Sequence, residues 1–424
     1  MRIERGWATI ISRSRDNEPK SAGGYAMEFV ARSEDDEIVR YQDPKRYAWL
    51  AAFFSPLLGL AMVFLYIATG AQSWVLFLPL IYAFVFVPIA DGFFGEDAHN
   101  PPDVIVPLMA SDGYYRSLLY LDVFFLYVSF FAMAWLAGTQ NIPWWAYIGL
   151  SLSAGITSAD AIFVGHELGH KTSKADRWGA QVALALIGYG HFTAEHNRGH
   201  HVQVATPEDS ASSRMGESVY RFALREIPGA LQRSWRLEKR RLAAAGLGAW
   251  SVRNEILTSW SLTVAIAAAL IAAFGWRVAP FLVIHHLYAW YGLTQANYVE
   301  HYGLLRQKLS NGRYEVPEPK HSWNTNHIFS NIITFHLQRH SDHHANVLRP
   351  YQSLRDFDDL PRLPSGYPGC FGLAIFPKAW FKVMDAKLLE CCGGDLNKAN
   401  IDPKSRAALF AEYGQIDTAA LRAD

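Results

Sequence analysis

The sequence of 424 residues has few cysteines, little charge and no net charge. Its three cysteines, Cys370, Cys391 and Cys392, form no Cys-x-x-Cys pair, which excludes a disulfide scaffold and a cysteine-based zinc or iron site. Charged residues make up 18%, less than the roughly 25% of soluble domains. The 39 basic side chains balance 39 acidic ones, so no strong field favours nucleic acid as a partner.

We also expect no secretory signal peptide, because residues 1–46 are polar and charged throughout. Residues 47–90, by contrast, contain no charged side chain and are long enough for two membrane-spanning helices of about 20 residues each. We expect an all-α membrane protein with six transmembrane helices, over residues 48–69, 74–90, 117–137, 143–164, 256–276 and 278–299.

Lysine and arginine are concentrated before the first expected span and over residues 171–253, whereas the connections 70–73 and 138–142 contain none. This asymmetry predicts that both termini and the long loops lie in the cytoplasm. We expect a cytoplasmic segment over 1–47, a transmembrane domain over 48–301 with a cytoplasmic loop over 171–255, and a cytoplasmic cap over 302–424. The charge-free stretch 178–194 is expected to be re-entrant or interfacial.

Sixteen histidines are present, and nine of them fall into four groups at the predicted cytoplasmic ends of spans or in cytoplasmic segments. Spacings of three or four residues place the rings of a group on one helical face, where they can reach one site. Neutral imidazole is a common ligand of Fe, Zn, Cu and Ni, and nine are too many for one ion with about six positions. We therefore predict a histidine-rich site for two metal ions, held by His166, His170, His196, His200, His201, His301, His340, His343 and His344.

Two divalent ions need nearby carboxylates that offset their charge and orient the rings through the second N–H group. The candidates by proximity, each of which could instead be a solvated or capping group, are Asp160, Glu167, Glu195, Glu300 and Asp342. The remaining histidines are expected to have structural roles: His99, His191, His285, His286, His321, His327 and His336.

Residues 166–170 also match H-E-x-x-H, the motif of zinc proteases in which the glutamate is the general base. An intramembrane protease of this kind needs one metal and three protein ligands, which leaves most of the clustered histidines unexplained. A transporter or sensor would be indicated by inverted repeats or paired broken helices, and the sequence has neither.

Four motifs in order resemble those of the integral-membrane alkane 1-monooxygenases, bacterial non-haem di-iron ω-hydroxylases. They are His-Glu-Leu-Gly-His-Lys (166–171), Glu-His-Asn-Arg-Gly-His-His (195–201), Asn-Tyr-Val-Glu-His-Tyr-Gly (297–303) and Leu-Gln-Arg-His-Ser-Asp-His-His (337–344). The stretches 92–102 and 213–218 also resemble the family, and the similarity runs from about residue 44 to residue 402. His285 and His286 match no motif of that family.

The resemblance implies two iron ions on the same nine histidines and the terminal hydroxylation of medium-chain n-alkanes to primary alcohols with O2 and two electrons. It implies rubredoxin as the electron carrier, reduced by an NADH-dependent reductase and present as a separate protein or a fused module. It also implies a multi-pass protein of the bacterial inner membrane, with its active site in the cytoplasm and its alkane drawn from the lipid.

A basic run in the loop could dock an acidic carrier, or could be only a solvated surface: Arg233, Arg236, Lys239, Arg240 and Arg241. Membrane fatty-acid desaturases and hydroxylases share the histidine motifs and remain the alternative enzyme class. The Asn-Tyr-Val-Glu-His-Tyr motif and the His-x-x-x-His-His spacing favour the alkane family.

Overall fold

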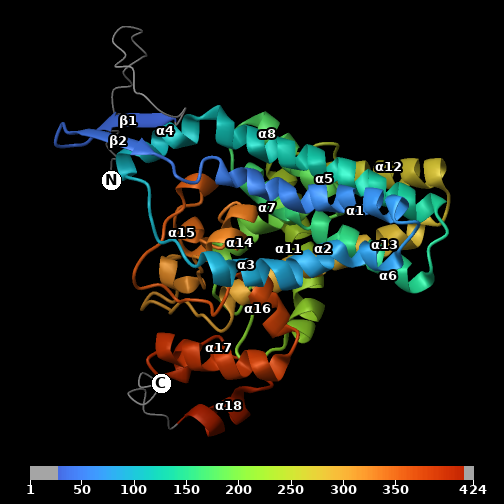
Figure 1. Ribbon diagram of the computed structural model, residues 1–424. Coiled ribbons are helices and arrows are strands. Elements are labelled where there is room, and N and C mark those ends of the chain that lie inside the picture. The colour runs from blue at the N-terminus through green and yellow to red at the C-terminus, as the bar shows by residue number, and fades with distance from the viewer. Residues whose placement is uncertain (1–26, 415–424) are drawn as a thin grey trace.

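The computed structural model describes residues 27–414, and these are predominantly helical (Figure 1). The one sheet among them is an antiparallel hairpin of β1 (Glu28–Arg32) and β2 (Ile38–Gln42), in which Glu28 faces Gln42. The parts of the predicted terminal segments over 1–26 and 415–424 lie outside the described residues.

The helices form a long bundle with shorter elements at one end and along one side (Figure 1). The apolar part contains α1 (Phe54–Ala68), α2 (Leu78–Ile81), α3 (Val87–Phe94), α5 (Gly113–Thr139), α6 (Trp144–Ser158), α7 (Asp160–Gly169), α12 (Glu255–Phe274) and α13 (Val278–His301). Between these lie α4 (Val106–Ser111), α8 (Lys174–Ala185), α9 (Phe192–Glu195), α10 (His201–Gln203) and α11 (Val219–Ala244). The C-terminal part contains α14 (Ile328–Ile333), α15 (His340–Ala345), α16 (Tyr367–Ala374), α17 (Pro377–Cys391) and α18 (Arg406–Tyr413).

Five helical segments of the described chain are long and apolar enough to cross a membrane, by length and composition. They correspond to the first five predicted spans: Ala48–Ala68, Ser73–Phe94, Gly113–Thr139, Trp144–Gly169 and Glu255–Phe274. The sixth expected span is the helix α13, which falls outside this set because polar side chains such as His285, His286 and Gln295 interrupt its apolar residues. Its crossing of the membrane stays a prediction.

The stretch 178–194 does not form one continuous helix. Helix α8 ends at Ala185, and the chain reverses at Gly188, whose φ of +69° suits glycine. A Cβ at this position would also lie 2.6 Å from the His286 ring, so the reversal needs the missing side chain. Both α8 and α9 pack against α7, so the two parts of the stretch lie along the same helix. The re-entrant or interfacial position of this stretch stays a prediction.

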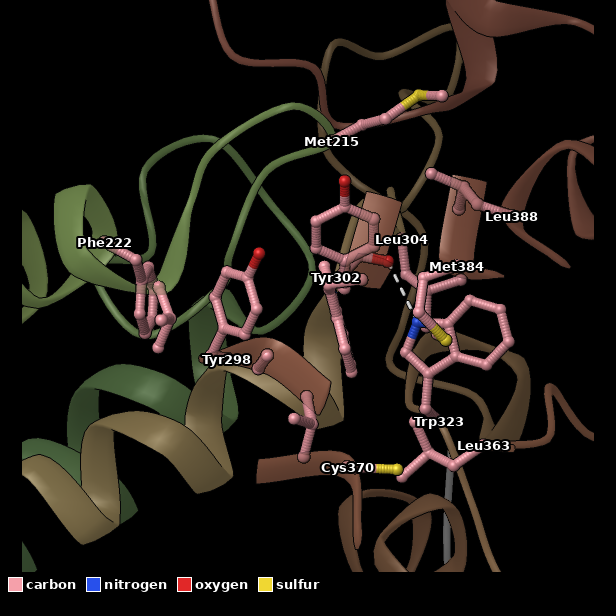
Figure 2. Packing of buried hydrophobic residues seen from close by; sticks show 14 of the residues in the cluster. Met215, Phe222, Tyr298, Tyr302, Leu304, Trp323, Leu363, Cys370, Met384 and Leu388 are labelled. Carbon is pink, nitrogen blue, oxygen red and sulfur yellow. Dashed lines mark hydrogen bonds between the residues drawn. The ribbon is translucent and has the colours of Figure 1, made fainter. Parts of the chain in front are cut away.

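The C-terminal part shares a hydrophobic core with the bundle. Tyr298 and Tyr302, near the end of α13, both pack against Trp380 of α17. On its other side Tyr298 packs against Phe222 of α11 (Figure 2). The indole N–H of Trp323 donates to the carbonyl of Tyr302 at 2.9 Å, drawn as the dashed line in Figure 2. Burial of several large aromatic side chains holds the end of α13 in place, each contributing about 1.5–3 kcal/mol.

Candidate metal centre

The nine histidines of the four sequence motifs meet in two groups where α7, α9 to α10, α13 and α15 converge. Within each group the ligand nitrogens lie within 4.8 Å of one another. The first group has five rings, His166, His170, His196, His201 and His343, and the second has four, His200, His301, His340 and His344.

Local helix geometry decides which ring joins which group. His166 and His170 lie four residues apart at the end of α7. Helix α15 carries its three histidines at its first, fourth and fifth positions. The segment His196–His200 is a π-helical turn, a wide turn that is rare and frequent at functional sites. This turn separates His200, which joins the second group, from His196 and His201, which join the first.

The ring nitrogens point toward one another within each group. The Nε2 atom of His343 lies 2.8 Å from that of His166 and 3.1 Å from that of His201. In the second group the Nε2 atoms of His340 and His344 are 2.8 Å apart. A shared cation is the usual reason for so many imidazole nitrogens to face one another.

Some of these nitrogens have no hydrogen-bond partner among the described residues, namely the Nε2 atoms of His170, His200 and His301. Burial lowers the pKa of His170 to about 4 and that of His301 to about 3, and burial with neighbouring imidazoles holds the pKa of His343 well below its usual range. The rings of His170, His301 and His343 are therefore neutral at pH 7 and keep their lone pairs for a metal. This donor set fits two first-row transition-metal ions such as iron.

A carboxylate that sequence reasoning missed supports one of the rings. The Oδ2 atom of Asp209 lies 2.8 Å from Nδ1 of His200, and the same oxygen accepts a bond from Ser212 at 2.6 Å. Burial would raise the pKa of Asp209, but His200 beside it lowers the pKa below its ordinary value. Asp209 lies in a loop without periodicity, and its only sequence signal is that it follows the second histidine motif closely.

Among the predicted carboxylates, Glu300 lies at the rings. Its Oε2 atom is 3.3 Å from Nε2 of His340, and its Oε1 atom accepts a hydrogen bond from the hydroxyl of Tyr367 at 2.8 Å. The same Nε2 atom of His340 also faces His344. The Glu300 carboxylate therefore lies on the side of the rings where a metal ion would bind. The other four predicted carboxylates are paired with different residues: Asp160 with Ser55, Glu167 with Lys171, Glu195 with Arg233, and Asp342 with Arg349.

Helix α11 holds the second histidine motif by ion pairs. Arg233 is 8% exposed and pairs with both Glu195 and Asp209, the latter at 2.7 Å. One helical turn and a half further along, the buried carboxylate of Glu238 pairs with Arg198 at 2.7 Å. The pKa of Glu238 falls to about 2 because its arginine partners outweigh the effect of burial.

These ion pairs correct the prediction that the whole basic run of α11 could dock an acidic carrier. Arg233 is buried inside the centre and cannot contact a carrier, so its assignment to a docking surface is wrong. Arg241 also has a partner within the chain, since it pairs with Glu238 at 2.6 Å. The exposed residues of the run are Arg236, Lys239, Arg240 and Arg241, of which Arg241 has its ion-pair partner within the chain.

The seven other histidines lie outside the two groups. His336 bonds the carbonyl of Tyr351 at 3.1 Å, and His285 and His286 face one another through their Nδ1 atoms at 2.9 Å. His321 forms a further group with Glu315 and Glu318 that could hold a cation, but Lys320 already pairs with both carboxylates. The remaining three contact neighbours: His99 with Asp97, His191 with Tyr189, and His327 with Thr325.

Replacement of Asp209 by asparagine should weaken metal binding. The substitution removes the charged partner that orients His200. It also removes one of the two carboxylates that compensate the charge of Arg233. Outer-sphere changes of this kind cost about 10- to 100-fold in metal affinity. The measurement is retained Fe²⁺ per chain against increasing chelator. The neighbouring, exposed Glu208 provides a matched control, because Glu208→Gln should leave retention unchanged. Equal retention in Asp209→Asn and the wild type would contradict the assignment.

Comparison with known proteins adds an independent line of evidence. A family model described as fatty acid desaturase matches residues 142–372. The chain is 49% identical over 382 residues to an alkane 1-monooxygenase of Ectopseudomonas oleovorans, covering 89% of this chain and 94% of that protein. It is 50% identical over 375 residues to alkane 1-monooxygenase 1 of Alcanivorax borkumensis (88% and 92%), and 48% identical over 381 residues to an alkane 1-monooxygenase of Pseudomonas putida (89% and 94%).

Proposed function

Because this chain belongs to the alkane 1-monooxygenase family, we propose that its two histidine groups hold two iron ions and serve the terminal hydroxylation of n-alkanes. The activity converts the terminal methyl group of an alkane into a primary alcohol. The observation that carries the iron proposal is the convergence of nine imidazoles in groups of five and four.

The protein's part in this chemistry is to hold and orient. Bound iron would supply the redox chemistry that activates O2 and removes hydrogen from the methyl group. Asp209 fixes the ring of His200, while Tyr367 holds Glu300 against His340 by a hydrogen bond. Burial of every one of these groups excludes bulk water, which protects a reactive site from side reactions.

A cavity on the membrane side of the centre is the proposed alkane site. It is lined mostly by apolar side chains of α3, α6, α7, α13 and α16 and of the turn before α3. Phe163 of its wall precedes His166 by three residues on α7, and Ala296 precedes Glu300 by four residues on α13. Each pair spans about one helical turn, so the cavity adjoins the centre.

The electron carrier that we propose is rubredoxin, reduced by its NADH-dependent reductase. The candidates that remain for its docking are three exposed basic side chains of α11: Arg236, Lys239 and Arg240. Since an acidic carrier would be steered by charge, its KM should rise with ionic strength. An unchanged KM would remove this surface from consideration.

We propose the bacterial inner membrane as the location, with the centre and both termini in the cytoplasm. The support is the excess of Lys and Arg in the segments before α1 and between α8 and α12, and the lack of charge in the connection 70–73. The orientation can be tested with a cysteine introduced into that connection. This cysteine should react with a membrane-impermeant thiol reagent added from the periplasmic side.

The full-length protein in bilayer nanodiscs, supplied with reduced rubredoxin and O2, should convert dodecane to 1-dodecanol. It should contain about two irons per chain, as two groups of ligands require. Formation of an alkene from an acyl chain would instead indicate a desaturase, and one zinc per chain would indicate the protease.

A further inference from the structure

Helix α11 exposes an apolar stripe within the part of the chain that is expected to be a cytoplasmic loop. Tyr220, Leu224 and Leu231 are all exposed, and Leu224 is exposed to 80%. Spacings of four and seven residues place their side chains on one face of the helix. A solvated helix carries polar side chains on its outer face, and contiguous exposed apolar surface commonly marks a contact site. The stripe therefore needs a partner.

The stripe continues onto neighbouring segments at both ends of α11. The hydroxyl of Tyr220 donates at 2.8 Å to the carbonyl of the residue before Phe376, and the Phe376 side chain is 66% exposed. At the other end the ring of Trp235 packs against Trp250 with ring centroids 5.5 Å apart, and Trp250 is 80% exposed. The apolar surface is therefore built from three segments: the turn before α17, the helix α11 and the loop before α12.

Helix α11 lies along the metal-centre end of the bundle. Near its C-terminus Glu238 accepts hydrogen bonds from Arg198 of the second histidine motif and, at 3.0 Å, from the N–H of Glu255, the first residue of α12. Nearer its N-terminus Glu226 accepts a hydrogen bond at 3.2 Å from Asn297 of the third histidine motif on α13. Since α12 is long and apolar enough to cross a membrane, α11 lies at the level where the chain enters the bilayer.

Three faces of α11 meet three different surroundings. The buried face, with Glu226 and Arg233, contacts the protein. About 120° around the helix from Leu224 lies Arg236, which is exposed and belongs to the basic face. The apolar stripe is the third face. An apolar face, a basic face and flanking tryptophan side chains are typical of a helix at a membrane interface. The bilayer is the partner that this position favours, because the membrane-length helix α12 begins five residues after Trp250.

We propose that α11, with Phe376 and Trp250 at its ends, is a membrane-interface anchor. Its apolar stripe enters the lipid leaflet on the side of the metal centre, at the boundary between head groups and acyl chains, and its basic face stays in water. The bilayer then holds the helix whose buried face pairs, through Arg233, with Glu195 and Asp209 beside the histidines. This part of the expected cytoplasmic loop is thus a lipid contact surface, a role separate from the hydroxylation itself.

The test measures the surroundings of single side chains on the iron-loaded, full-length protein in nanodiscs. Leu224→Cys and Leu231→Cys place a thiol on the stripe, and Arg236→Cys, on the basic face of the same helix, is the matched control. Each variant also carries Cys391→Ser, because Cys391 is the exposed one among the three native cysteines. A nitrobenzoxadiazole fluorophore on the introduced thiol is then quenched either by lipids with a nitroxide on the acyl chain or by iodide in the water.

Quenching by the nitroxide lipids should be severalfold stronger at both leucine positions than at Arg236, and quenching by iodide severalfold weaker, because an interfacial helix buries its apolar face about 5–10 Å deep. Iodide quenching at the leucine positions equal to that at Arg236 would overturn the proposal. Protection of the leucine positions from both quenchers would overturn it as well, since a second copy of the chain or another protein would then cover the stripe. An iron content equal to that of the wild type in all three variants shows that α11 keeps its place.

Discussion

Replacement of His343 by alanine should abolish alkane hydroxylation and lower the iron content from about two ions per chain to about one. The Nε2 atom of His343 lies against both His166 and His201, so its loss opens the middle of the group of five. A change in the outer sphere of a metal costs about 10- to 100-fold, so loss of a ligand should reduce activity by at least about 100-fold. Iron analysis and dodecane turnover are the measurements.

His99 serves as the control, because its exposed ring contacts Asp97 and lies outside both groups. His99→Ala should retain both irons and its activity. Full-length His343→Ala recovered from the membrane with the same yield, but with both irons and full turnover, would refute the ligand assignment.

Replacement of Arg233 by methionine should destabilise the protein by about 3–5 kcal/mol, because it leaves two buried carboxylates without their cation. Glu195 is 5% exposed and Asp209 is 1% exposed, and both pair with this guanidinium. Since Asp209 also orients His200, metal retention should fall together with stability. Unfolding of the protein in nanodiscs, followed by heat or denaturant, measures the effect.

Arg236 provides the matched control on the same helix, one turn further along and exposed. Arg236→Met should change stability by less than about 0.5 kcal/mol. Combining Arg233→Met with Glu195→Gln removes one of the stranded charges and should recover part of the loss. Equal stability of the Arg233 and Arg236 variants would show that the buried ion pairs do not stabilise the centre.

The relatives confirm the predicted family and enzyme class. The structure confirms the predominantly helical fold and its histidine clusters. These features were accessible because they depend on local periodicity: apolar runs of helical length, and histidines three or four residues apart. Helix geometry turns such spacings into shared faces wherever the helix lies.

Interactions between distant segments were not accessible. Asp209 and Arg233 are 24 positions apart and belong to no motif, yet both contact the second histidine motif. The basic run of α11 illustrates the difficulty: a charge pattern does not distinguish an exposed arginine such as Arg236 from a buried one such as Arg233.

The sequence by itself determined that this protein is rich in membrane-length helices and carries nine histidines in metal-binding patterns. Both properties depend only on residues within a few helical turns of one another. Only the tertiary structure decided that these histidines divide into five and four, that Asp209 supports His200, and that Glu300 alone of the five predicted carboxylates lies at the rings. The physical reason is that each of these arrangements depends on distances between side chains from separate helices, which burial and packing set together.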